Sequence, residues 1–158
     1  MPTIAFPSPE FPGLAGLRLD HPDGWYPLPD VAQYLAVAKA VPDGQFRPNV
    51  IGSVQRMRKG TAMQQAIAEL QQRTAGLRDY AHIGEEQLLI SGWPGYRTEG
   101  SFIDPGAGTL VQAIRLAVVD RGPVEDLVQI TGTCHATQAD EVWEQIRAIQ
   151  ESVQIIAS

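Results

Sequence analysis

Cys134 and His135 are neighbours in the sequence and carry the side chains that a thiol nucleophile and its general base would need. They end the segment PVEDLVQITGTCH (123–135), whose apolar pattern predicts a strand. Neighbouring residues of a strand point to opposite faces of a sheet, so the thiol and the imidazole cannot readily meet. A cysteine is also commonly a small apolar residue of the core. We therefore do not interpret this pair as a catalytic dyad.

The other polar residues form no recognisable catalytic or metal-binding motif. The histidines, His21, His82 and His135, are far apart and lack a His-x-x-x-His spacing. Glu85 and Glu86 are adjacent and are expected to point apart, unlike the paired carboxylates of a glycoside hydrolase. We assign no catalytic residue, no metal ligand and no cofactor from the sequence, although folding could still bring distant residues together.

Aromatic residues in two segments rich in proline and glycine are the candidates for binding. Trp25 lies in DGWYPLPD (23–30), which predicts a loop, and Trp93 and Tyr96 lie in the GWPGY stretch. Rigid aromatic side chains in loops bury a large area with little entropy loss and often dominate binding. The alternative is that each tryptophan closes one end of the core. We take Trp25, Trp93 and Tyr96 as candidate residues of a ligand- or partner-binding surface.

The composition is that of a globular protein with one domain. Of 158 residues, 44% are hydrophobic and 19% are charged, which argues against disorder. The net charge of −6 disfavours nucleic acid as a partner, and RMRKG (56–60), the one short basic cluster, is expected to be a solvated loop. No apolar run approaches the 18 residues of a membrane span.

The N-terminal segment predicts an extended arm and a cytoplasmic location. Four prolines within residues 1–15 disfavour a helix there, so we expect a proline-rich arm ahead of one domain at 16–158. The segment lacks the basic and apolar regions of a signal peptide, and no cysteine stands there to carry a lipid. Unless a leader has been removed, the sequence predicts a cytoplasmic protein.

Two amphipathic helices are expected. The first spans 61–75, where Thr61 and Gln64 fit a capping box. The second spans 138–153 and is expected to start after Thr137 as its cap. Its apolar stripe should face a sheet and consists of Val142, Trp143, Ile146, Ile149 and Val153.

The rest of the pattern predicts strands. We expect them at 16–22, 30–41, 49–57, 78–84, 86–92, 95–103, 109–120 and 123–135. The segment 30–41 also fits a helix, and 78–84 with 86–92 fits one strand kinked at Gly84. Short connections favour antiparallel pairing, so the fold class is α+β.

The segment DGQFRPNVIGSVQRM (43–57) is expected to place a strand and not to carry chemistry. Phe46 would pack under the sheet, and Pro48 would start the strand. Asn49 would hydrogen-bond the turn backbone.

Four motifs in this order resemble the LpqN-like family of actinobacteria, which has the PsbP-like (Mog/PsbP) fold. They are HPDGWYPL, FRPNVIGSVQRM, ISGWPGYR and QITGTCHATQADEVWEQIRAIQESV, and the resemblance covers roughly residues 16–155. It implies an α/β/α sandwich with a central, mainly antiparallel, twisted sheet flanked by helices.

The resemblance also implies binding without catalysis. LpqN-like members are often lipoproteins linked to cell-envelope transport, with trehalose-lipid ligands and partner proteins, and other PsbP-like members are adaptors or chaperones. We expect a non-catalytic binding module, an adaptor or chaperone for a protein partner or a lipid-like or glycolipid ligand. The alternatives are a hydrolase whose site forms only in three dimensions, with Cys134 or a histidine, and an immunity or regulatory protein for a secreted toxin.

Overall fold

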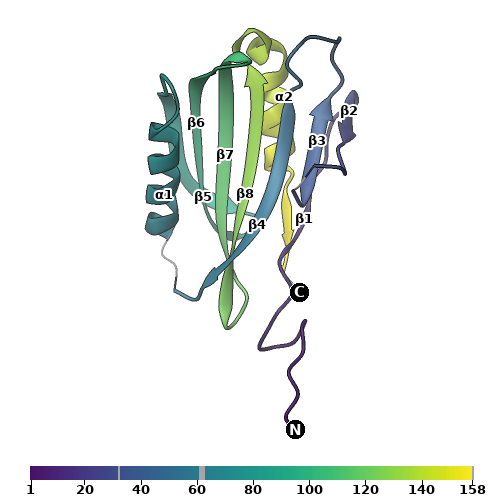
Figure 1. Ribbon diagram of the computed structural model, residues 1–158, viewed down its shortest axis with the longest axis vertical. Coiled ribbons are helices and arrows are strands. Elements are labelled where there is room, and N and C mark those ends of the chain that lie inside the picture. Colours follow the sequence, from purple (N-terminus) through teal and green to yellow (C-terminus); the bar gives the residue numbers. More distant parts are fainter. Residues whose placement is uncertain (32, 61–62, 158) are drawn as a thin grey trace.

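The centre of the protein is a seven-stranded sheet, seen in a computed structural model that describes residues 1–31, 33–60 and 63–157 (Figure 1). Each neighbouring pair of strands in it is antiparallel. In spatial order the strands are β2 (Trp25–Pro27), β3 (Leu35–Lys39), β4 (Asn49–Arg58), β8 (Val124–His135), β7 (Gly108–Asp120), β6 (Trp93–Asp104) and β5 (Ala81–Ile90). The expected α+β class with a mainly antiparallel sheet is confirmed.

A second, small sheet joins the two ends of the chain. It consists of β1 (Gly16–Arg18) and β9 (Gln154–Ile156), which pair antiparallel with Leu17 opposite Ile155. Leu17 and Ile155 also pack against the main core. Neither the pairing nor β9 was predicted, because β9 has only three residues and directly follows the predicted helix at 138–153.

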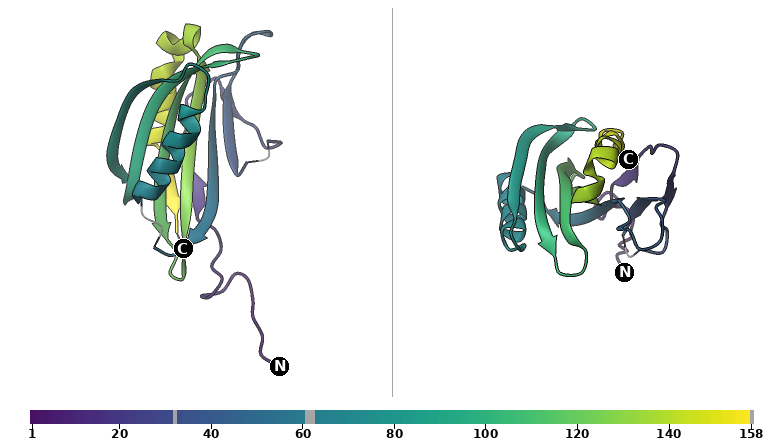
Figure 2. Two further views of the ribbon diagram at one scale, coloured as in Figure 1. Left: turned by 60° about the vertical axis from the view of Figure 1, so that its left-hand side comes forward. Right: turned by 90° about the horizontal axis from the view of Figure 1, so that it is seen from above.

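The two helices pack on opposite faces of the main sheet. In the left view of Figure 2, α1 (Met63–Ala75) lies in front of the sheet and α2 (Ala139–Glu151) lies behind it. The side chains of β7 explain this, because alternate residues join different cores: Ile114 and Leu116 pack with α1, and Ala113 and Ala117 pack with α2. The helix α1 packs on β6 and β7, while α2 packs on β8, β4 and β7.

The position of α2 on the sheet depends on a glycine and a buried glutamine. A Cβ atom on Gly132 of β8 would lie only 2.4 Å from Cγ2 of Ile146, so the helix can approach this closely only over a glycine. Gln150 is buried and donates hydrogen bonds to the carbonyl oxygens of Ala113 (2.9 Å) and Ile130 (3.2 Å). These contacts fix the rotation of α2 on the sheet.

Two expected boundaries differ in the structure. The predicted loop 23–30 contains β2, because Trp25 pairs with Lys39 of β3. The predicted strand segments at 78–84 and 86–92 form the single strand β5, with a bulge between His82 and Gly84. The kinked-strand alternative was therefore the right one.

The caps of the helices also differ from expectation. The short 3₁₀ helix at Ala136–Gln138 precedes α2, and its N-cap is His135 and not Thr137. The ring of His135 accepts a hydrogen bond from the backbone N–H of Thr137, and the Gln138 side chain accepts one from the backbone N–H of His135. Thr61, the expected cap of α1, lies outside the described residues.

The turn before β4 confirms one expectation and corrects another. Asn49 donates a side-chain hydrogen bond to the carbonyl oxygen of Arg47 at 3.0 Å, as the turn chemistry predicted. Pro48 is buried next to it. Phe46, however, does not pack under the sheet. It lies half-buried in the loop before β4 and lines a pocket, because the strand begins only at Asn49.

Asp126 of β8 ties residues 12–15 to the sheet. Its buried carboxylate lies 3.2 Å from Nε of Arg56 and 3.6 Å from Nε of Arg121, and it accepts a hydrogen bond from the backbone N–H of Ala15 at 2.8 Å. Arg56 also donates to the carbonyl oxygens of Pro12 and Gly13. The expectation of a solvated loop at 56–60 is therefore wrong for Arg56, which lies within β4 and forms a partly buried ion pair.

Candidate functional site

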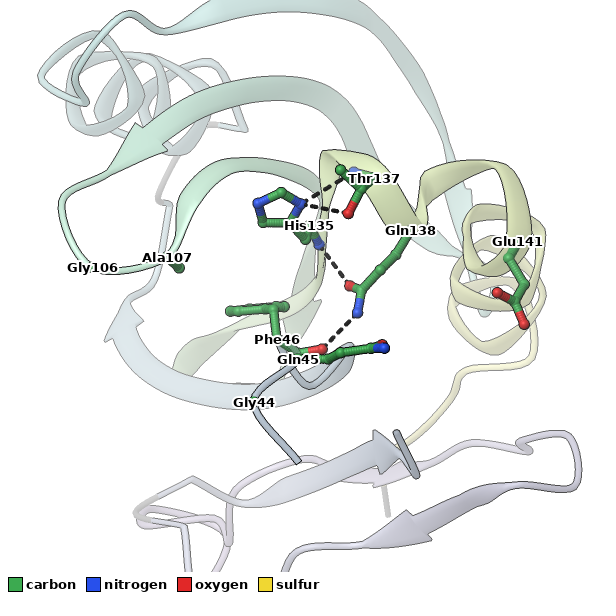
Figure 3. A pocket seen from close by; sticks show the side chains of 9 residues that line it. All are labelled: Gly44, Gln45, Phe46, Gly106, Ala107, His135, Thr137, Gln138 and Glu141. Carbon is green, nitrogen blue, oxygen red and sulfur yellow. Dashed lines mark hydrogen bonds between the residues drawn. The ribbon is translucent and has the colours of Figure 1, made fainter. Parts of the chain in front are cut away.

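A pocket of about 690 Å³ opens at one end of the sheet, where three connections meet (Figure 3). It lies between the loop that follows β3, the turn between β6 and β7, and the start of α2. Its lining residues are Gly44, Gln45, Phe46, Gly106, Ala107, His135, Thr137, Gln138 and Glu141. We call it the end pocket.

Much of the hydrogen-bonding capacity in the end pocket is already used within the protein. Nδ1 of His135 lies 2.9 Å from the hydroxyl of Thr137 and caps the 3₁₀ helix. The Gln138 amide accepts from the His135 backbone at 2.9 Å and donates to the carbonyl oxygen of Phe46 at 2.7 Å (Figure 3). These groups hold the connections together and offer few free contacts to a ligand.

A second hollow lies between α2 and the strands β5 to β7, and we call it the α2 groove. It consists of two cavities of about 470 and 270 Å³ that share Arg147 in their walls. From above, the sheet is seen to curve around α2 (Figure 2, right). This curvature places side chains of β5, β6 and β7 opposite those of the helix.

The larger cavity has an apolar and aromatic wall. Ile83 of β5, Val111 of β7 and Trp143 of α2 line it, with Asp140 and Glu144 also on its helical side. Ile83 is exposed, and Trp143 is only partly buried, so apolar surface remains open here. The guanidinium of Arg147 lies 5.9 Å from the centre of the Trp143 ring, a cation–π contact.

A buried carboxylate organises the boundary between the two cavities. Glu99 of β6 has a side chain only 8% exposed. It accepts hydrogen bonds from Nε and Nη2 of Arg147, at 3.2 and 2.9 Å, and from Arg97 at 3.3 Å. The hydrogen bonds to Glu99 raise the pKa of the Arg147 guanidinium. Arg147 is thus held across the gap between helix and sheet.

The smaller cavity is lined mainly by charged side chains. They are Glu86, Arg97, Arg115, Arg147 and Glu151, with Leu88. Arg115 is the most buried of the three arginines, with 11% of its side chain exposed. Burial lowers the pKa of its guanidinium. Among the described residues its one ion pair is with Glu151, at 4.0 Å.

A third cavity of about 510 Å³ lies on the other face, between α1 and β5. Gln64, Gln71 and Glu85 line it together with Tyr96. The hydroxyl of Tyr96 hydrogen-bonds the carboxylate of Glu85. Burial and this bond raise the pKa of Tyr96. Glu85 and Glu86 therefore point to different faces, as predicted.

The three aromatic residues singled out from the sequence do not come together. Trp25 is buried in β2, and its indole N–H donates to Gln145 of α2 at 3.1 Å. Trp93, at the start of β6, packs against the core between α2 and the sheet, which we call the α2 core. Tyr96 is buried in the core between α1 and the sheet, the α1 core. The expectation that they lie in loops is wrong, because all three are strand residues. Their role in binding stays a prediction.

Cys134 and His135 are separated as the alternation of a strand predicts. Cys134 is fully buried in the α2 core, and burial raises the pKa of its thiol to about 11, away from reactive values. His135 caps the 3₁₀ helix instead. Across residues 1–31, 33–60 and 63–157, no three His, Cys, Asp or Glu side chains group as a metal site would require.

The arginines of the α2 groove were missed in the sequence, although one signal was present. Arg115 interrupts the apolar run of β7, TLVQAIRLAVV, at a position whose neighbours two residues away, Ala113 and Ala117, are buried. A charge on the buried face of a strand marks either an ion pair or a binding site. Arg147 gave no such signal, because an arginine on an amphipathic helix is ordinary.

The arrangement of the sheet and helices defines the class of protein. At 10% identity, the fold is similar to cyanobacterial PsbP from Synechocystis sp. PCC 6803 (TM-score 0.57), with 98% of each chain covered. At the same identity it is similar to the Saccharomyces cerevisiae Ran-binding protein Mog1p (TM-score 0.56), with 89% of this chain and 90% of that chain covered. The protein therefore has the PsbP/Mog1-like α+β fold.

The sequence places the chain in a particular family of this class. The model of the family described as "Probable lipoprotein LpqN" matches residues 8–156, and the chain belongs to that family. The crystal structure of Mycobacterium tuberculosis LpqN, "involved in cell envelope biogenesis", is similar with a TM-score of 0.79 at 16% identity. The match covers 92% of this chain and 86% of that chain. Among curated proteins, none matches this sequence.

The family corrects the expected location. The prediction of a cytoplasmic protein is wrong, because the family is described as "Probable lipoprotein LpqN" and LpqN as "involved in cell envelope biogenesis". In the part of the chain that the structure describes, neither helix is long and apolar enough to cross a membrane.

Proposed function

We propose that this protein is a non-catalytic binding protein of the cell envelope, and that its α2 groove holds a lipid-like amphiphile. Membership of the LpqN family supports the envelope setting. The likeness to LpqN, itself described as involved in cell envelope biogenesis, supports it further.

The observation that carries this proposal is that apolar side chains gather in the larger cavity of the α2 groove, whereas the smaller cavity has charged residues at five of its six lining positions. Ile83, Val111 and Trp143 line the larger cavity, where an acyl or alkyl chain would cover their apolar surface. The smaller cavity, beyond Arg147, is lined mainly by charged residues and would face a polar headgroup. A ligand with one apolar and one polar end matches this division.

A protein partner is the second candidate, and it rests on β5. This strand forms an edge of the main sheet beside the groove. Ile83 and Leu89 of β5 are exposed, so a partner strand could pair with β5 and cover them. In this case the protein would act as an adaptor or chaperone for another envelope protein.

An N-terminal arm and one aromatic residue also belong to this proposal. Residues 1–15 would serve as an arm, tied to the sheet through residues 12–15, and 16–158 as the binding domain. The side chains of the first eleven residues are mostly exposed, which supports an arm. Of the three candidate aromatic residues, Trp93 is only partly buried, whereas Trp25 and Tyr96 are buried. Trp93 is therefore the best placed of the three to contact a partner.

A binding titration with an uncharged amphiphile tests the groove. An alkyl polyoxyethylene compound, kept below its critical micelle concentration, is titrated into the protein and followed by calorimetry. Trp143→Ala should weaken binding by about tenfold, because it removes much of the apolar wall. Tyr34→Ala is the matched control, since Tyr34 is an exposed aromatic outside the groove. Equal affinities for the wild type and Trp143→Ala would contradict the groove as the site.

A further inference from the structure

Arg97 and Arg115 are direct neighbours across the β6–β7 pair and belong to the face that carries α2. Like charges in directly opposite positions of an antiparallel pair repel each other and destabilise the sheet. The charge of Arg97 also contributes to the lowered pKa of Arg115. A structural role alone would favour one arginine and one acid at these positions.

The acids of the α2 groove are unevenly shared among its three arginines. Glu99, the buried acid, accepts hydrogen bonds from Arg147 and Arg97. Glu86 hydrogen-bonds Arg97 from the rim, with 52% of its side chain exposed. The ion-pair partner of Arg115 is Glu151, whose side chain is 66% exposed and lies 4.0 Å away, too far for a hydrogen bond. The most buried of the three groove arginines therefore has the weakest ion pair.

We propose that the smaller cavity of the α2 groove is an anion subsite, in which Arg115 binds an oxyanion such as a phosphate, sulfate or carboxylate. This inference deepens the proposed function and rests on it in one respect, that the oxyanion is taken to belong to the amphiphile's headgroup. Arg97 and Arg147 flank the site and are held in place by Glu99.

The chemistry of the guanidinium favours an oxyanion over other polar groups. Its planar N–H donors match pairs of oxygen atoms and form charge-assisted hydrogen bonds, which are stronger than neutral ones. The cavity of about 270 Å³ is large enough for a phosphate-sized group. The walls contributed by Arg97 and Arg147 would add two more cations around that group.

The rim acids do not close the site to an anion. Glu86 and Glu151 are more than half exposed, so water and salt screen their charges. Arg115 is shielded from water and keeps a stronger field inside the cavity. An oxyanion would replace the distant Glu151 carboxylate with a direct partner.

The test compares two probes on three proteins. The probes are inorganic phosphate and dodecyl phosphate, with the uncharged alkyl polyoxyethylene amphiphile as reference, each followed by calorimetry and thermal melting. The proteins are the wild type, Arg115→Gln and Arg47→Gln, the last a control at an exposed arginine outside the groove. Arg115→Met serves as a second variant should the glutamine form be unstable.

We expect the wild type to bind dodecyl phosphate more tightly than the uncharged amphiphile and to melt at a higher temperature in phosphate. Arg115→Gln should lower the affinity for dodecyl phosphate by about 10-fold to 100-fold, the loss of a charge-assisted contact, and change the affinity for the uncharged amphiphile far less. Without phosphate, Arg115→Gln should melt no lower than the wild type, since it removes an under-compensated buried cation. A purely structural arginine would give a lower melting temperature and no change in selectivity.

The outcomes separate this inference from the proposed function. Binding of the uncharged amphiphile with equal phosphate affinities in wild type and Arg115→Gln would overturn the anion subsite alone. Phosphate binding that Arg115→Gln abolishes, without binding of the uncharged amphiphile, would support the subsite and overturn the lipid proposal. Failure of all the probes to bind the wild type would overturn both.

Discussion

Arg147 of α2 and Glu99 of β6 form a two-point ion pair across the gap between helix and sheet, with N–O distances of 3.2 and 2.9 Å. Glu99 is nearly buried, while Arg147 is 39% exposed. The pair therefore links the rotation of the helix to the position of β6. It also lies at the boundary between the larger and the smaller cavity of the α2 groove.

Glu99→Gln should destabilise the protein and loosen this boundary. The change leaves Arg147 and Arg97 without their shared buried acid. We expect the free energy of unfolding to fall by about 1–3 kcal/mol, less than for a fully buried pair because Arg147 is partly solvated. Urea denaturation measures it. The control is Glu144→Gln, whose 84% exposed side chain pairs with the same arginine and should give a change near zero. Equal effects of the two variants would contradict a special role for Glu99.

Asp126→Ala should be among the most damaging single changes. It removes the fully buried carboxylate between Arg56 and Arg121 and the acceptor for the Ala15 backbone. Loss of one partner from a buried charge network costs about 3–5 kcal/mol. Asp120→Ala, which removes an exposed pair with Lys59 and a turn hydrogen bond from the Gly122 backbone, should lower stability far less than Asp126→Ala does. Limited proteolysis should also cut near residues 12–15 sooner in Asp126→Ala, and an unchanged cleavage pattern would show that other contacts hold this segment.

The thiol of Cys134 should make stability fall at alkaline pH. Its pKa is raised from 9.0 to about 11 by burial, so between these values the unfolded chain loses the proton while the folded chain keeps it. The full contribution is present below pH 9 and is lost as the pH rises toward 11. Urea denaturation from pH 8 to 11 should show a steeper decline for the wild type than for Cys134→Ala. Parallel curves would mean that the thiol is exposed to solvent. A thiol reagent at pH 8 should also react slowly with the native protein and quickly in urea.

The sequence predicted the parts of the fold that local patterns specify. The long strands β4, β6, β7 and β8 and both helices have clear periodicities, and Asn49 has the expected turn contact. It did not predict β2 or β9, because three-residue strands are set by their partners across the fold.

The candidate site was harder to predict because it is made by curvature. Arg97, Arg115 and Arg147 are 18 and 32 residues apart in sequence, counted in chain order. Strand pairing places Arg97 opposite Arg115, and Arg147 lines the same cavity because the sheet bends around α2. The aromatic residues looked like loop residues because proline and glycine flank them. Backbone pairing placed Trp25 and Tyr96 in strands and buried them instead.

Trp143 and Ile146 should respond differently to truncation, although the helical pattern predicted the same apolar stripe for both. Ile146 is fully buried over Gly132, so Ile146→Ala should cost about 2–5 kcal/mol. Trp143 packs against the core with one side and lines the α2 groove with the other.

Because part of its ring already contacts solvent, Trp143→Ala should cost only about 1–3 kcal/mol, below the 3–5 kcal/mol typical of a fully buried aromatic residue. The same variant should lose affinity for the uncharged amphiphile, whereas Ile146→Val, a mild core truncation away from the groove, should keep it. Thermal melts and binding titrations on the same samples make the comparison. If Trp143→Ala destabilises the protein as much as Ile146→Ala does and keeps its affinity, Trp143 is a core residue and the apolar end of the groove is not a binding surface.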